Sequence, residues 1–245
     1  AAAVATALML LAPVLVRAMA STLGPGVIAS FNYAQKLVEL PTGILITSIS
    51  TVALTRLSSL HAKQPGRQVV ASAVRDTQYA VLIAAAVACL GYWFADSVVQ
   101  VLFGRGEMDA DALNRVSLLA KVALLGLPFI AISSMATAHL SATNQTSKIL
   151  KPTAASLLLL PLLAVPGLYW SSELALMSAV VAFNAVVAFA LVLNSRLPLY
   201  GEGGVFSATA CQPFALVLIV GFLAAALDWA LELQNHWMRL LLAGA

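Results

Sequence analysis

VIASFNYAQKLVELPTGILITSISTVALT, residues 27–55, is an apolar stretch of 29 residues that nevertheless contains a cation, an anion and a proline near its middle. At 1.5 Å per residue, a helix of this length is roughly 44 Å long, which exceeds a hydrocarbon core of about 30 Å. The stretch therefore predicts a membrane-spanning helix that is tilted, kinked or extended into the cytoplasm.

The whole chain has the composition of an integral membrane protein. Of its 245 residues, 61% are hydrophobic and only 9% are charged, and apolar runs follow one another along the sequence. About 20 apolar residues suffice for one crossing, and the short alternating segments of a transmembrane β-barrel are not apparent. We predict an all-α, polytopic transmembrane helix bundle of about seven helices plus the start of an eighth. The expected helices are residues 1–21, 27–55, 78–103, 116–138, 152–170, 174–194 and 206–230.

Both ends of the sequence lie within apolar runs, the last of which covers residues 237–245. We therefore expect residues 1–245 to form one helical lobe of a longer chain, without a recognisable signal peptide.

Basic residues are distributed unevenly among the predicted loops. The loops after the second, fourth and sixth helices contain seven Lys and Arg residues, whereas the other loops contain two, or three with Lys121. The positive-inside rule places the first set in the cytoplasm, so the first helix runs from inside to outside. Because these residues are spread over separate loops, they indicate topology and no nucleic-acid partner. The seven are Arg56, Lys63, Arg67, Arg75, Lys148, Lys151 and Arg196.

Lys36 lies at an unusual depth for a cation. It follows the start of the second predicted helix by nine residues, which is roughly 14 Å and close to the membrane centre. Insertion scales assign a central cation a cost of about 2.5–3.5 kcal/mol, so it is expected to face protein or water. Three other polar residues share its helix face within an arc of about 100°: Asn32, Gln35 and Glu39.

Two interpretations of this polar face are open. In the first, Lys36 and Glu39 neutralise each other and tie the helix to its neighbours. In the second, which we favour, Lys36 offers a positive charge to an anionic substrate in a water-filled cavity whose electrostatics Glu39 sets. Arg17, near the outer end of the first helix, is a further candidate either as a ligand or as an interfacial anchor. Pro41 removes one backbone hydrogen bond and predicts a bend.

Motifs of covalent catalysis or metal binding are not apparent. The sequence has no Gly-rich phosphate loop, nucleophile elbow or acidic metal motif. His61, His139 and His236 lack metal-ligand spacing, and Cys89 and Cys211 lie inside apolar segments. We therefore predict that the chain is not an enzyme and has no cofactor and no metal; a structural assembly subunit is the other non-enzymatic possibility. Interhelical hydrogen bonds are expected from Asn184, Ser133, Ser134 and His139.

Three stretches resemble a known family: GVIASFNYAQKLVELPTGILITSISTVALTRLSSL (26–60), VVQVLFGRGEMDADAL (98–113) and LLGLPFIAI (124–132). They are similar to the lipid II flippase family, MurJ or MviN, of the multidrug and oligosaccharidyl-lipid exporter superfamily. The resemblance implies fourteen helices in two lobes around a central cavity, with this chain similar to helices seven to fourteen. The partner of this lobe would then be the N-terminal lobe of the same longer chain, which residues 1–245 do not include.

The function implied by the resemblance is transport in peptidoglycan biosynthesis, and hence in building the cell wall and cell shape. An undecaprenyl-pyrophosphate-linked precursor, lipid II, would be moved across the bacterial cytoplasmic membrane by alternating access, among membrane lipids. The alternatives are another lipid-linked oligosaccharide flippase or a cation-coupled drug exporter of the same superfamily.

The family motif YA-x-R-L-x-x-x-P-x-G is matched here with Lys36 in place of the arginine. The charge is retained but the guanidinium fork is lost, which favours phosphate attraction without bidentate recognition. The sodium site of some members needs acids in the helices that correspond to residues 1–21 and 152–170, which contain none, so we predict no sodium site. The expected substrate-binding residues are Lys36, Glu39, Gln35, Asn32 and Arg17, and the expected hinge residues are Pro41 and Gly43.

Overall fold

The computed structural model describes residues 2–63, 66–104, 108–169 and 172–195, together with Leu197 and Val205. The predicted helix at 206–230 and the start of another at 237–245 lie outside these residues. In the described part every regular element is helical, which confirms the all-α class. The elements are α1 (Ala2–Ala20), α2 (Val27–Pro41), the π-helix η1 (Thr42–Ile46), α3 (Thr47–Lys63), α4 (Arg67–Phe103), α5 (Ala110–Leu124), α6 (Leu127–Ala142), α7 (Ser147–Tyr169) and α8 (Glu173–Ser195).

Several described helices can cross a membrane by length and composition. Four do so alone: the continuous helix Val27–Lys63, α4, α7 and α8. The pair α5 and α6 is a fifth when taken as one span. The protein is therefore a multi-pass membrane protein, as the apolar runs predict.

The single helix expected at 116–138 is in fact a broken span. α5 and α6 meet at an angle of 43°. Pro128 lies in the first turn of α6 and has no N–H to donate to the carbonyl of Leu124, and the loss of this hydrogen bond favours a break between the two helices. The break was not anticipated, although the proline that explains it was visible in the sequence.

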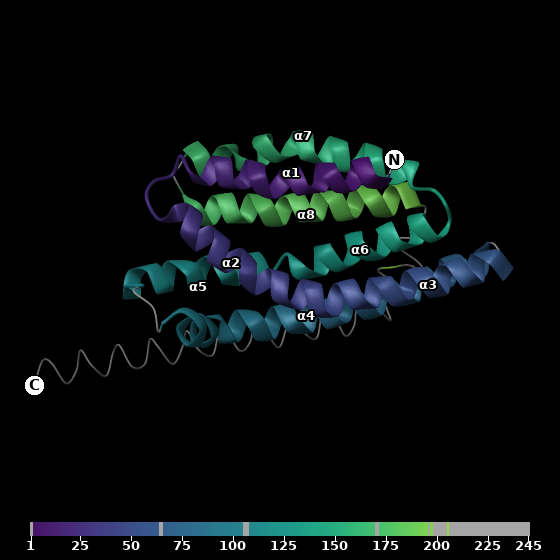
Figure 1. Ribbon diagram of the computed structural model, residues 1–245, viewed down its shortest axis with the longest axis horizontal. Helices are drawn as coiled ribbons and strands as arrows, with labels where there is room; N and C mark the ends of the chain where they lie inside the picture. Colours follow the sequence, from purple (N-terminus) through teal and green to yellow (C-terminus); the bar gives the residue numbers. More distant parts are fainter. Residues whose placement is uncertain are drawn as a thin grey trace, which may run out of the picture.

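The helices form two layers (Figure 1). α7 packs against both α1 and α8 in one layer, and α4 packs against both α5 and α6 in the other, where α3 also packs on α6. α2 runs obliquely from the first layer toward the second and contacts α5 (Figure 1). Small residues allow this close approach in lipid: a Cβ added to Gly167 of α7 would lie 2.7 Å from the backbone N of Leu176 in α8.

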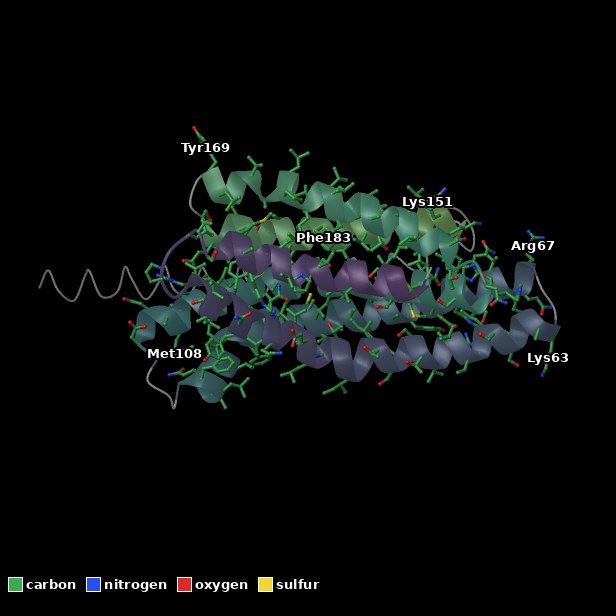
Figure 2. All side chains as sticks on the ribbon, turned by 45° about the horizontal axis from the view of Figure 1, so that its top comes forward. Lys63, Arg67, Met108, Lys151, Tyr169 and Phe183 are labelled. Atoms are coloured by element: carbon green, nitrogen blue, oxygen red, sulfur yellow. The ribbon has the colours of Figure 1, made fainter. Side chains whose placement is uncertain are left out.

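Basic residues mark one end of the bundle. Figure 2 shows Lys63, Arg67 and Lys151 at that end, whereas Met108 and Tyr169 lie at the opposite end. The charge distribution predicts that these basic residues share one end of the bundle, and the positive-inside rule predicts that this end faces the cytoplasm.

The segment after Pro41 is a π-helix within a continuous helix, η1 joining α2 to α3. Two threonine hydroxyls donate to backbone carbonyls in the irregular region: Thr42 Oγ1 to the carbonyl of Val38 at 2.7 Å, and Thr47 Oγ1 to that of Thr42 at 3.0 Å. Single π-turns in α-helices are frequent at functional sites. The helix then continues to Lys63, beyond the expected end at residue 55.

Candidate functional site

Lys36 and Glu39 lie on the open face of α2. The buried face of this helix includes Ala34, Leu37 and Val38, and the two charged side chains point away from it. Lys36 Nζ donates to Glu39 Oε2 at 2.5 Å, and the side chains remain 66% and 53% exposed. The pair is therefore formed within α2 itself and does not tie α2 to another described helix.

Arg17 and Asn32 join α1 to α2 near the outer end of the bundle. Arg17, in the last turn of α1, donates through Nε to Asn32 Oδ1 at 2.9 Å. This bond uses one of the five guanidinium N–H donors. Asn32 precedes Lys36 by four residues, so the two side chains are neighbours on the surface of α2. A patch that we call the α2 charged face therefore contains Arg17, Asn32, Lys36 and Glu39.

Gln35 turns toward a different neighbour. Its Nε2 lies 3.8 Å from Met177 Sδ of α8, in a partly buried contact. Gln35 thus lies at the edge of the α2 charged face and contacts α8 rather than Lys36 in this structure.

The charges of this patch sum to one positive charge, from two cations and one carboxylate. At the depth of Lys36 such groups cannot face hydrocarbon without a cost of several kcal/mol. An anion with more than one negative charge could interact with both cations, whereas a monovalent cation would meet net repulsion. The arrangement favours anion binding.

Gly43 has open space around it. A Cβ added there would meet no atom within 4 Å, so close packing does not explain a glycine at this position. It lies in η1 directly after Pro41, where the backbone is already irregular. These two residues remain the predicted hinge.

A cross-helix ionic cluster between α4 and α5 was not anticipated. Asp96 accepts from Lys121 Nζ at 2.7 Å and also from the hydroxyl of Ser117. Lys121 Nζ lies 5.9 Å from the ring centre of Tyr92. We call Asp96, Ser117 and Lys121 the α4/α5 cluster. Ser117 and Lys121 follow Asp96 by 21 and 25 residues, so no spacing within one helix could have indicated their contacts with it.

A second ionic contact joins α3 to α4 near the basic end. Arg56, which the sequence places in a cytoplasmic loop, lies within α3 and pairs with Asp76 of α4. It also donates to Ser72 Oγ at 2.9 Å. The contact ties the two helices together.

The expected interhelical hydrogen bond of Ser133 differs from the prediction. Ser133 donates to the carbonyl of Ile130 within α6, so it makes no interhelical bond in this structure. α3 packs on α6, and His139 of α6 is buried. Within the described residues, no group of three or more His, Cys, Asp or Glu side chains could hold a metal ion.

Comparisons with known proteins agree on one family. A family model described as "Lipid II flippase MurJ" matches residues 1–243. A lipid II flippase MurJ of Burkholderia cenocepacia is 31% identical over 99 residues, covering 40% of this chain and 19% of that protein. A probable lipid II flippase MurJ of Rhizobium tropici is 23% identical over 228 residues, covering 90% of this chain and 40% of the relative.

A solved structure has the same fold. The lipid II flippase MurJ in an inward closed conformation superimposes with a TM-score of 0.65 at 16% identity. The match covers 82% of this chain and 41% of the solved one, so the present chain spans less than half the length of the proteins it resembles. Because the family model extends over nearly the whole sequence, the chain belongs to the MurJ lipid II flippase family.

Proposed function

We propose that this chain is the C-terminal lobe of a flippase that moves lipid II across the bacterial cytoplasmic membrane by alternating access. The observation that carries the proposal is the exposure of Lys36 and Glu39 on the open face of α2. Family membership supports a lipid-linked substrate and transport without covalent chemistry, and hence the prediction that the chain is not an enzyme.

The depth of the α2 charged face argues for a wet cavity. Lys36 follows Val27, the first residue of α2, by nine residues, or roughly 14 Å. A charged face at this depth requires either water or another protein surface. A cavity between this lobe and the remainder of a longer chain satisfies that requirement, and it is where transporters commonly bind substrates.

The α2 charged face would bind the diphosphate of the substrate. Lys36 would exchange its bond with Glu39 for a bond to a phosphate oxygen, an interaction that a compact ammonium makes readily. Arg17 would add a second cation, and Asn32 would hold its guanidinium in place while offering its amide N–H groups. Gln35 would hold the adjacent part of α2 against Met177.

Glu39 has a separate role in this scheme. Without a ligand it neutralises Lys36, so the empty cavity does not hold an uncompensated cation at mid-membrane depth. A diphosphate that displaces Glu39 from Lys36 brings two negative charges, which can interact with Lys36 and Arg17 together. Release becomes possible because Glu39 competes with the substrate for Lys36.

Alternating access needs a part of the lobe that deforms. Pro41 and Gly43 lie within two turns of Lys36, and together with the π-helix η1 they would allow α2 to change its direction relative to α3. The headgroup would then be sheltered in the cavity while the polyprenyl chain stays in lipid.

The test is complementation of a bacterium depleted of its own lipid II flippase by the full-length gene. Lys36→Ala should abolish growth, and Lys36→Arg should restore it because the cation is retained. Glu39→Ala should reduce growth less than Lys36→Ala. Normal growth with Lys36→Ala, at an expression level equal to that of the unmodified protein, would remove the proposed site.

A further inference from the structure

A groove lined only by apolar side chains runs between α2 and α4 on the flank of the α2 charged face. Its volume is about 350 Å³. Leu37, Leu40 and Pro41 of α2 form one wall. Leu90 and Phe94 belong to the α4 wall, where they are 60% and 52% exposed. A groove of this composition suits a hydrocarbon chain.

The groove has a defined outer limit. The rings of Tyr33 and Phe103 pack with their centres 4.8 Å apart and their planes at 57°. Tyr33 precedes the groove residue Leu37 by one helical turn, and Phe103 follows the groove residue Val98 by five residues. This aromatic contact bridges α2 and α4 at one end of the groove.

Small side chains shape the α4 wall. Gly91 and Ala95 both line the groove and are one turn apart on α4. A Cβ added to Gly91 would lie 2.9 Å from Leu124 Cδ1, so the side chain of Leu124 from α5 already fills the space beside Gly91 and lines the groove there.

The groove adjoins the proposed anion site on the same helix. Leu37 is the residue next to Lys36, and Leu40 lies one turn beyond it on the same side. A hydrocarbon chain gains little from an apolar groove when it leaves lipid, because lipid is equally apolar. The positive charge of Lys36 beside the groove therefore determines which hydrocarbon binds there. A hydrocarbon that carries a diphosphate can occupy the groove while its diphosphate interacts with Lys36.

We propose that this groove binds the first isoprene units of the lipid-linked substrate while Lys36 binds its diphosphate. The inference rests on the proposed function and adds to it a site for the hydrocarbon. The groove fixes the direction in which the chain leaves the cavity and so positions the diphosphate against Lys36.

The experiment uses the full-length transporter in lipid nanodiscs with three probes: farnesyl diphosphate, farnesol and inorganic pyrophosphate. Leu90→Trp should fill the groove and weaken farnesyl diphosphate binding by at least about tenfold, without changing the Kd of pyrophosphate. Val101→Trp is the matched control, because Val101 is 69% exposed on α4 but does not line the groove. It should change neither Kd. Val98→Phe, at the outer part of the groove, provides a second filling variant, and melting temperatures establish that each variant is folded.

The outcomes separate the two proposals. Unchanged farnesyl diphosphate binding in both folded groove variants overturns the groove, even where Lys36→Ala weakens pyrophosphate and so supports the anion site. Equal affinity for farnesol and farnesyl diphosphate also overturns it, because the groove would then accept any hydrocarbon. Normal binding of pyrophosphate and farnesyl diphosphate to Lys36→Ala overturns both proposals.

Discussion

Two lysine–carboxylate pairs in this lobe have the same chemistry but different surroundings. Lys36 and Glu39 are three residues apart on one helix and are both largely exposed. Lys121 and Asp96 come from α5 and α4, and Ser117 gives the carboxylate a second donor. The first pair holds no two helices together, whereas the second joins α4 to α5.

This difference is our reason for proposing a binding role for the first pair and a structural role for the second. A cross-helix pair stabilises packing, and its cost in lipid is balanced by the contacts that it maintains. A pair within one helix contributes only a few tenths of a kcal/mol to that helix, far less than the cost of placing a cation at the membrane centre. The Lys36 and Glu39 pair is therefore best explained by a ligand or by water.

The largest expected effect comes from exchanging the charges of the first pair. The double variant Lys36→Glu with Glu39→Lys keeps an ion pair at the same spacing but moves the cation by three residues. We expect loss of complementation as complete as with Lys36→Ala, because the proposed diphosphate site requires the cation at its original position. Growth at the normal rate would indicate that transport needs an ion pair on α2 but not a cation at position 36. The proposed difference in role between the two pairs would then be wrong.

The matching exchange in the α4/α5 cluster should be tolerated far better. Asp96→Lys with Lys121→Asp preserves the contact between α4 and α5, so complementation should remain. Lys121→Ala removes the contact and should lower the melting temperature of the purified transporter by about 2–4 °C, as expected for roughly 1 kcal/mol. Loss of complementation by Lys121→Ala without any change in melting temperature would show a binding role that we do not assign to this cluster.

Glu39→Gln should have an intermediate effect on binding. Removing the carboxylate leaves Lys36 without a competitor, so the affinity for inorganic pyrophosphate should rise by about three- to tenfold. Titration calorimetry on the nanodisc-embedded transporter measures this change. Transport should nevertheless fall, since the substrate would be released more slowly. Weaker pyrophosphate binding would mean that Glu39 helps to hold the ligand.

The smallest effect is expected at Gly43. Because a Cβ has open space there, Gly43→Ala introduces no clash and should stabilise the helix by about 0.5–1 kcal/mol. The melting temperature should rise by about 1–4 °C while transport falls by roughly twofold, because a stiffer η1 opposes bending. A rise in melting temperature with undiminished transport would argue against a hinge at this position.

Much of the fold follows from the sequence because lipid imposes strong local rules. Apolar length predicts the crossings and loop charge predicts which ends share a side, and the bundle has both features. The break between α5 and α6 was missed because one apolar run covers it and only Pro128 indicates it. The extension of α3 to Lys63 was missed because its last residues are polar and lie beyond the apolar stretch.

The candidate site could be predicted only in part. Spacing along one helix placed Lys36, Glu39 and Asn32 together, since neighbours on a helix are set by period alone. The contacts of Asn32 with Arg17 and of Gln35 with Met177 depend on how α2 packs against α1 and α8. A single sequence carries no direct signal for how its separate helices pack against one another.

Solvent access to position 36 tests the central claim most directly. Lys36→Cys would be introduced into a full-length transporter whose native cysteines, including Cys89 and Cys211, are replaced, with Leu158→Cys as the lipid-facing control because Leu158 is 81% exposed on α7. The membranes are permeabilised so that a charged, membrane-impermeant maleimide reaches both of their sides. The maleimide should label the cysteine at position 36 and leave the cysteine at position 158 unlabelled. Labelling of position 36 by a lipophilic maleimide alone, as at position 158, would place Lys36 against hydrocarbon and contradict the wet cavity.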